Sequence, residues 1–330
     1  MAHALPEPRV FHQLISHALC SCRVRGFCYQ TQKNKAIMQW KGRRQSGNIE
    51  DSRGKSYRGA SAGGGGIGLL VTIFRMFGFK GVLAALALGL LLWNLGIMDP
   101  SMLLGGEASV EQRQVEITPE EQERFEFVKV VLADTEDVFA AEFNRLGKQY
   151  EQPKLTVYRG KVPTACGTGD AAMGPFYCPG DRKIYIDLGF YDELAKTFDA
   201  PGDFAQAYVV AHEVGHHVQK LLGASEKVNA KRGQPDFNEY SVRLELQADF
   251  YAGVWAHHNR EYLDRGDIEE AMRAANAIGD DAIQKKTRGR VLPHSFTHGT
   301  SAQRMRWFNK GLVSGKIEDG DTFSMPYQRL

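Results

Sequence analysis

The chain has 330 residues and a formal net charge of +2, which hides two parts of opposite sign. Residues 1–80 carry 13 Lys and Arg against 3 Asp and Glu, whereas residues 99–330 carry 28 against 36. The basic part lacks regularly spaced aromatic side chains, which argues against nucleic-acid binding. The composition therefore favours one acidic domain with a membrane anchor over two globular domains or a nucleic-acid-binding protein.

The first 80 residues are predicted to be a basic, mostly disordered cytoplasmic segment. Residues 1–37 contain three closely spaced cysteines in no established zinc-binding pattern, and we expect a disordered extension there. Met38 is an alternative start of the native chain. Residues 46–68 are rich in Gly and Ser, which is typical of a flexible segment.

Residues 81–98 form an 18-residue run without a charge, and the preceding stretch 67–79 is apolar apart from Arg75. This length is sufficient for a transmembrane helix. The run begins too late for a cleaved signal peptide. Because the basic excess precedes it, the positive-inside rule predicts a single-pass membrane protein with a cytoplasmic N-terminus and its acidic domain outside. In a bacterium with two membranes, this places the span in the inner membrane and the domain in the periplasm.

A linker at 99–118 leads to the predicted domain at 119–330, which begins with a helix at 119–148. Alternating apolar residues predict short strands at 155–159 and 183–187. Between these strands, Cys166 and Cys178 are expected to form a disulfide in an oxidising compartment. Two free buried thiols are the alternative.

An H-E-x-x-H motif lies in the helix predicted at 203–223. His212 and His216 are four residues apart, so both imidazoles face one side of a helix and can bind one metal ion. Glu213 lies beside them, where its carboxylate can take a proton from a metal-bound water. A chance match is the alternative, since this pattern also occurs in unrelated helices.

A second predicted helix, at 236–258, carries Glu245 and Asp249 four residues apart. Glu245 can complete a set of three zinc ligands, and Asp249 can accept a hydrogen bond from the far nitrogen of a ligand histidine. A solvated helix face is the alternative, although the apolar neighbours make unpaired carboxylates costly there. Both helices are expected to begin with a capping box, at Asp203 and Asp236.

The last part of the chain is predicted to hold a helix at 267–278, a polar loop at 279–293 and a final helix capped by Thr300 or Ser301. His298 precedes this helix. The family resemblance described below implies that this stretch approaches the metal site, where we expect His298 to donate a hydrogen bond to the oxyanion of a tetrahedral intermediate. A role in capping or packing the helix is equally open.

These motifs resemble gluzincin-type metallopeptidases, which pair H-E-x-x-H with a downstream E-x-x-x-D. More narrowly, the chain resembles a family of neutral zinc metallopeptidases among bacterial membrane-anchored proteins. The matching stretches are MQWKGRRQSGNIEDSRG at 38–54, AHEVGHHVQ at 211–219, RLELQADFYAGVWAHH at 243–258 and HGTSAQRMRWF at 298–308. The resemblance implies a zincin-like domain, a zinc ion and hydrolysis of peptide bonds.

The sequence thus predicts an α+β, zincin-like metallopeptidase domain on a single transmembrane helix, with Zn²⁺ as cofactor and a peptide or protein as substrate. His212, His216 and Glu245 hold the metal, and Glu213 is the general base that later protonates the leaving amine. By analogy with zincins, the strand at 182–190 pairs with the extended substrate. The alternatives are a non-catalytic zinc-containing scaffold or assembly factor, and a zinc amidase that acts on cell-wall peptides.

Overall fold

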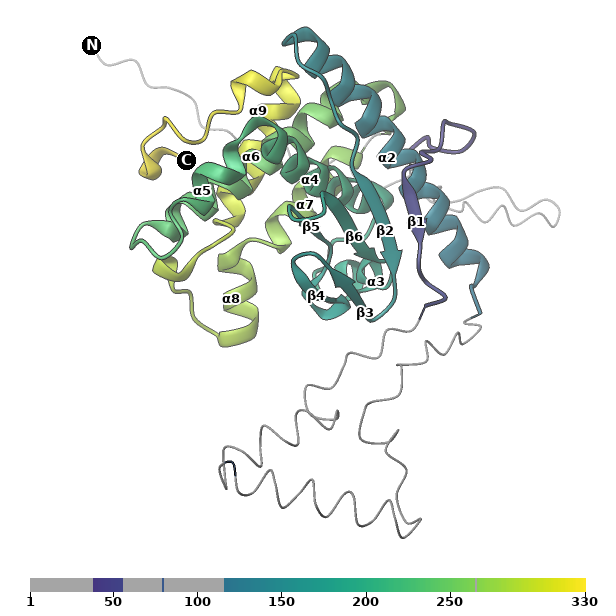
Figure 1. The fold of residues 1–330 in the computed structure, drawn as a ribbon, viewed down its shortest axis with the longest axis horizontal. Helices are drawn as coiled ribbons and strands as arrows, with labels where there is room; N and C mark the ends of the chain where they lie inside the picture. Colours follow the sequence, from purple (N-terminus) through teal and green to yellow (C-terminus); the bar gives the residue numbers. More distant parts are fainter. Residues whose placement is uncertain (1–37, 56–78, 80–115, 265) are drawn as a thin grey trace, which may run out of the picture. The chain divides into compact units, whose positions relative to one another are not determined.

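The computed structural model describes residues 38–55, 79, 116–264 and 266–330 (Figure 1). Its described part combines α-helices with two small β-sheets, in agreement with the predicted mixture of helices and strands. The predicted membrane span at 81–98 lies outside the described residues, as do residues 1–37 and nearly all of the linker. Among the helices within the described ranges, none is both long and apolar enough to cross a bilayer.

The larger sheet has four strands in the order β1, β2, β6, β5. Their bounds are Ile49–Asp51 for β1, Lys154–Tyr158 for β2, Phe176–Cys178 for β5 and Lys183–Asp187 for β6. β2 pairs in parallel with both β1 and β6, whereas β5 runs antiparallel to β6. The two predicted strands are therefore confirmed as the centre of this sheet. A small antiparallel pair, β3 (Lys161–Thr164) and β4 (Gly167–Asp170), follows β2.

The described part contains eight α-helices. They are α2 (Pro119–Arg145), α3 (Phe190–Lys196), α4 (Asp203–Leu222), α5 (Ala224–Asn229), α6 (Phe237–His258), α7 (Asp267–Ala277), α8 (Asp280–Arg288) and α9 (Ser301–Ser314). The helices predicted at 119–148, 203–223, 236–258 and 267–278 are confirmed within a few residues, and α9 begins at a capping box between Thr300 and Gln303. The predicted loop at 279–293 is wrong because α8 occupies most of it. Acidic residues in its first turn, basic residues in its last turn and a left-handed Gly289 all favour this short helix.

The predicted capping boxes of α4 and α6 are also wrong. Gly202 is the N-cap of α4, so Asp203 lies within the first turn, where its charge complements the helix dipole. Asp236 is the N-cap of α6 but makes no side-chain capping bond. Its carboxylate accepts a hydrogen bond from Lys231 at 3.0 Å instead.

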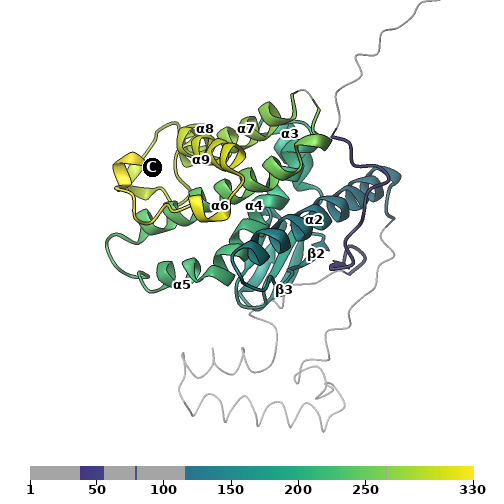
Figure 2. The same ribbon diagram turned by 90° about the horizontal axis from the view of Figure 1, so that it is seen from above.

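Helix α4 lies between α2 and α6 in both Figure 1 and Figure 2. Gly215 allows α4 to approach α6 closely, because a Cβ atom at this position would lie 2.9 Å from the backbone oxygen of Ala248. Gly253 of α6 and Gly311 of α9 allow a second close crossing, since a Cβ at either one would overlap the backbone of the other helix. These two crossings bring side chains from α4, α6 and α9 together.

Residues 38–55 correct the predicted organisation, because they belong to the same compact unit as the rest of the described chain. The whole segment 1–80 was expected to be mostly disordered, and residues 46–68 to be flexible. Instead, β1 pairs with β2, and the side chains of Met38 and Trp40 are buried. The partners of this segment are more than 60 residues away in the sequence, so its local Gly- and Ser-rich composition gave no sign of them.

Candidate metal centre

Three side chains with metal-binding atoms meet where α4 crosses α6. His212 and His216 extend from one face of α4, one helical turn apart, and Glu245 faces them from α6. The Nε2 atom of His212 lies 3.3 Å from one oxygen of Glu245, and that of His216 lies 3.6 Å from the other oxygen. One ligand atom from each of the three residues lies within 4.8 Å of the others.

This arrangement fits a zinc ion. Zinc binds nitrogen and oxygen ligands at about 2.0–2.2 Å in a tetrahedron, so neighbouring ligand atoms are expected about 3.3 Å apart. Two histidines and one carboxylate are a ligand set of catalytic zinc sites, which keep one position open. His212, His216 and Glu245 are therefore the residues that would hold the metal.

The far nitrogens of both histidines are held by hydrogen-bond acceptors. Nδ1 of His212 lies 2.9 Å from Asp249, as predicted, and Nδ1 of His216 lies 2.8 Å from the side-chain oxygen of Gln219. Each acceptor favours a proton on Nδ1, which leaves Nε2, on the side of Glu245, as the nitrogen that would bind the metal. The role of Gln219 was not predicted, although its position three residues after His216 places it on the same helix face.

Arg304 of α9 is the main residue that the sequence analysis missed. Its guanidinium donates two hydrogen bonds to the Asp249 carboxylate, from Nε and Nη2, each at 2.9 Å. The hydroxyl of Tyr208 also donates to Asp249, at 2.5 Å. All three side chains are buried, so the carboxylate behind His212 is fully enclosed by donors. Arg304 lies in the stretch that carried the family resemblance, but nothing in the sequence identified its partner.

The charges of this centre depend on one another. Burial disfavours the charged forms of Asp249 and His212, but their mutual attraction and the charge of Arg304 lower the pKa of Asp249 to about 2. Burial likewise opposes protonation of His212, yet Asp249 and Glu245 outweigh it and raise its pKa to about 9. The pKa of Glu245 is lowered despite burial, because His216, His298 and His212 surround it. The buried carboxylates of Glu245 and Asp249 therefore favour a bound cation at this site.

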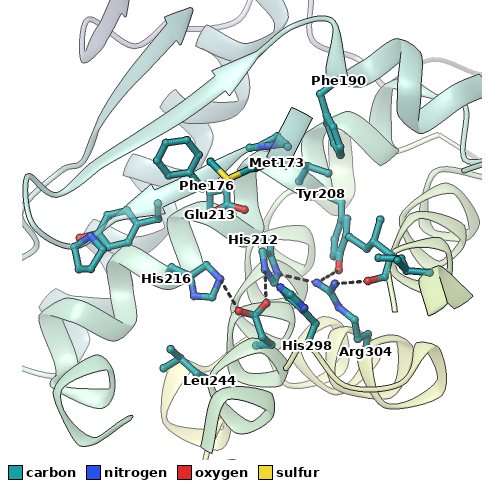
Figure 3. Close-up of a pocket in the computed structure, with 18 of the residues that line it drawn as sticks. Met173, Phe176, Phe190, Tyr208, His212, Glu213, His216, Leu244, His298 and Arg304 are labelled. Carbon is teal, nitrogen blue, oxygen red and sulfur yellow. Dashed lines mark hydrogen bonds and ion pairs between the residues drawn. The ribbon is translucent and has the colours of Figure 1, made fainter. Parts of the chain in front are cut away.

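The metal centre opens into a cavity of about 520 Å³. Glu213 lines it beside the two histidines, and Figure 3 shows Met173 and Phe176 next to Glu213. Phe190 adds a further apolar side chain to the wall. The cavity therefore combines a polar metal-binding end with an apolar wall, as sites for organic substrates usually do.

Strand β5 forms part of this wall through Phe176 and Tyr177. The prediction that residues 182–190 pair with substrate is wrong, because β6 is an inner strand bonded on both edges, to β2 and β5. Within the described chain, β5 is one of the two terminal strands of the sheet, and β1 is the other. A disulfide joins Cys178, at the end of β5, to Cys166.

His298 also lines the cavity. Its backbone N–H donates to Asp280 at 2.6 Å, and its Nδ1 lies 3.3 Å from the same carboxylate. The nearby charge of Glu245, followed by the bond to Asp280, raises the pKa of His298. The alternative that His298 caps the last helix is wrong, because Thr300 does so.

His217, which had no predicted role, connects α4 to the sheet. Its ring is buried, with Nε2 2.6 Å from the backbone oxygen of Glu151 and Nδ1 3.0 Å from the hydroxyl of Tyr177. Burial lowers its pKa. The neutral ring donates to Glu151 and accepts from Tyr177, which fixes β5 relative to the helix that carries the metal-binding histidines.

A comparison with protein families bears directly on this centre. The family model described as "Putative neutral zinc metallopeptidase" matches residues 38–323. The chain belongs to this family. The match includes all three candidate ligands and the segment from residue 38 onward, and it identifies Zn²⁺ as the cofactor.

Relatives of this chain include proteins of Escherichia coli and Mycobacterium tuberculosis. "Uncharacterized protein YpfJ" of Escherichia coli K12 is 48% identical over 291 residues, which is 87% of this chain and 99% of that protein. "Uncharacterized protein Rv2575" of Mycobacterium tuberculosis H37Rv is 41% identical over 211 residues, which is 60% of this chain and 71% of that protein. No solved structure matches the chain.

Proposed function

We propose that this protein is a zinc-dependent peptidase that hydrolyses peptide bonds in a peptide or protein substrate. The observation that carries this proposal is the convergence of His212, His216 and Glu245 beside Glu213 at one end of a cavity. Zinc bound at such a ligand set lowers the pKa of a coordinated water and polarises a carbonyl oxygen. The zincin-like character of the domain is part of the same proposal.

Three polar residues of the cavity besides the metal ligands have a defined task in this account. Glu213 accepts a proton from the attacking water and transfers it to the leaving amine. His298, whose Nδ1 faces Asp280, donates a hydrogen bond to the oxygen that gains negative charge. Arg304 holds Asp249, and Asp249 holds the ring of His212.

The walls of the cavity favour a peptide. Strand β5 is a terminal strand beside the metal centre, and an extended peptide can pair with such an edge through its backbone. Met173 and Phe176 offer apolar contacts to substrate side chains next to Glu213. Because β6 is enclosed in the sheet, β5 takes the place that the sequence assigned to residues 182–190.

A non-catalytic zinc scaffold is supported less well. A structural zinc site usually has four protein ligands, whereas the described residues place three around this centre, together with a carboxylate that has no ligand role. An amidase that acts on cell-wall peptides would use the same residues, so substrates have to separate it from a protease.

The test uses the full chain, purified in detergent, because residues 38–55 are part of the fold. We expect about one zinc per chain and cleavage of unfolded casein that a chelator abolishes and added zinc restores. Cleavage of muropeptides without cleavage of casein would favour the amidase. Zinc binding without hydrolysis of either substrate would contradict the peptidase and favour the scaffold.

A further inference from the structure

Two buried glutamines follow one another behind the ring of His216. Gln219 of α4 is 0% exposed, and Gln247 of α6 is 7% exposed. The side-chain oxygen of Gln219 lies 2.8 Å from Nδ1 of His216, and its Nε2 donates to the side-chain oxygen of Gln247 at 3.2 Å. Gln247 in turn donates from its own Nε2 to the backbone oxygen of Gly320 at 2.8 Å. A chain of hydrogen bonds thus connects the C-terminal segment to a metal-binding histidine.

The direction of each hydrogen bond in this chain is fixed by its neighbour. A backbone oxygen only accepts hydrogen bonds, so Gly320 requires the NH2 group of Gln247. The oxygen of Gln247 then faces Gln219, which must present its own NH2 group. The backbone oxygen of Leu244 imposes the same orientation, because it also accepts from Nε2 of Gln219, at 2.5 Å. The oxygen of Gln219 is therefore the atom left for His216, whose ring must carry its proton on Nδ1.

The C-terminal segment holds Gly320 closely against α6. A Cβ atom at this position would lie 2.6 Å from the ring of Phe250, so glycine lets the backbone come this near. Two residues later, Thr322 is 0% exposed, and its hydroxyl donates to the backbone oxygen of Arg243 at 2.7 Å. The guanidinium of Arg243 donates back to the backbone oxygen of Thr322 and, at 2.8 Å, to that of Met325. This packing keeps the Gly320 oxygen in place.

The two metal-binding histidines are thus supported by different chemistry. His212 is held by a carboxylate, whereas His216 is held by a neutral amide. A carboxylate behind His216 would add a third buried negative charge to those of Glu245 and Asp249, which is costly without its own partner. A chain of amides with fixed directions orients the ring without that charge.

We infer that Gln247 is a positioning residue of the metal centre: with Gln219 and the backbone oxygen of Gly320, it fixes the tautomer and orientation of the His216 ring. Neither glutamine is among the residues that line the cavity. The inference rests on the zinc site that the proposed function uses, but not on the hydrolysis of peptide bonds. Its test therefore measures zinc and the ring proton.

Zinc affinity of the full chain, measured by competition with a chelator at fixed pH, tests the inference. Gln247→Met keeps the length of the side chain and removes both its donor and its acceptor. We expect it to weaken zinc binding about 10-fold, and Gln219→Met to weaken it about 10- to 100-fold, as for other groups behind metal-binding histidines. Because Gln247 acts through Gln219, adding Gln247→Met to Gln219→Met should weaken zinc binding no further.

Thr322→Val is the matched control, because it removes a buried hydrogen bond of the same segment outside the glutamine chain. It should lower the stability of the domain and leave its zinc affinity unchanged. An equal loss of zinc affinity in Thr322→Val and Gln247→Met would overturn the inference, since general packing of the segment would then explain both. A further loss in the double variant would overturn it too.

The ring proton provides a second measurement. In NMR spectra of the zinc-bound chain with isotope-labelled histidine, we expect the Nδ1 proton of His216 to exchange with water faster in Gln247→Met than in the parent. That of His212 should not change, because Asp249 holds it. A parent chain without zinc would refute the proposed function and this inference with it. Zinc binding and proton exchange that Gln247→Met leaves unchanged would refute the inference alone.

Discussion

The guanidinium of Arg304 forms two hydrogen bonds with the carboxylate of Asp249, both at 2.9 Å and both fully enclosed by protein. The same carboxylate holds Nδ1 of His212 at 2.9 Å. A charge on α9 is thereby connected, through a carboxylate on α6, to a metal-binding histidine on α4. The orientation of His212 therefore depends on Arg304, which is neither a metal ligand nor the general base.

Replacement of Arg304 is expected to weaken both the fold and the metal centre. Arg304→Met leaves the buried Asp249 without its counter-charge, so the free energy of unfolding should fall by about 3–5 kcal/mol. Arg304→Lys keeps the charge but loses the paired hydrogen bonds. Its free energy of unfolding should therefore lie between those of the parent and of Arg304→Met. Denaturant unfolding and zinc titration measure these effects. Arg306→Met, on the exposed side of the same helix, is the control; equal stability of Arg304→Met and this control would contradict the role of Arg304.

Replacements of the two α6 carboxylates at the metal centre are expected to weaken zinc binding in a fixed order. Glu245→Gln removes a charged ligand, so zinc should be lost or bound weakly. Asp249→Asn removes only the support of His212 and should lower zinc affinity about 10- to 100-fold. Glu239→Gln, on the exposed face of α6, should change nothing. Zinc content after dialysis against a weak chelator gives the order, and full zinc occupancy in Glu245→Gln would mean that the third ligand lies elsewhere.

His298 is expected to affect turnover and not metal content. His298→Gln should lower kcat/KM by about 100-fold, the usual effect of losing one donor to a developing oxyanion, while zinc stays near one per chain. His294→Gln, which changes an exposed histidine in the preceding turn, is the matched control. If His298→Gln lost its zinc, or kept full activity, His298 would have no part in stabilising the oxyanion.

The raised pKa of His212 predicts opposite effects of pH on the zinc-free and zinc-bound forms. In the chelated protein, the charged ring is stabilised by Asp249 and Glu245, so its contribution is present below pH 6.5 and is lost as pH rises towards 9. Zinc requires the neutral ring, so its affinity should rise with pH, up to about tenfold per unit for each proton released. Thermal unfolding with and without chelator between pH 6.5 and 9 measures both trends. A chelated protein that becomes more stable over this range would show that the charged ring does not contribute.

The sequence predicted those parts of the site that depend on local helical spacing. His212 and His216 share a helix face because they are four residues apart, and the same spacing put Asp249 beside Glu245. The strands at the centre of the sheet and the longer helices also follow from local patterns. The helix at 280–288 was missed because its apolar face is short and its charged residues suggested a loop.

The remaining features arise from contacts between distant parts of the chain. Nothing near Arg304 shows that its partner is Asp249, 55 residues earlier. The order of the strands, which makes β5 a terminal strand and β6 an inner one, follows from pairing that no single stretch encodes. The place of residues 38–55 depends on α2 and β2, so composition alone assigned them to a disordered tail.

Glu213→Gln tests the central claim most directly. This change keeps the size and position of the side chain and removes the proton acceptor, with Glu239→Gln as the control. We predict about one zinc per chain in both variants and in the parent, and casein cleavage by Glu213→Gln at least about 100-fold slower than by the other two. Full activity of Glu213→Gln with zinc bound would contradict the proposed peptidase mechanism.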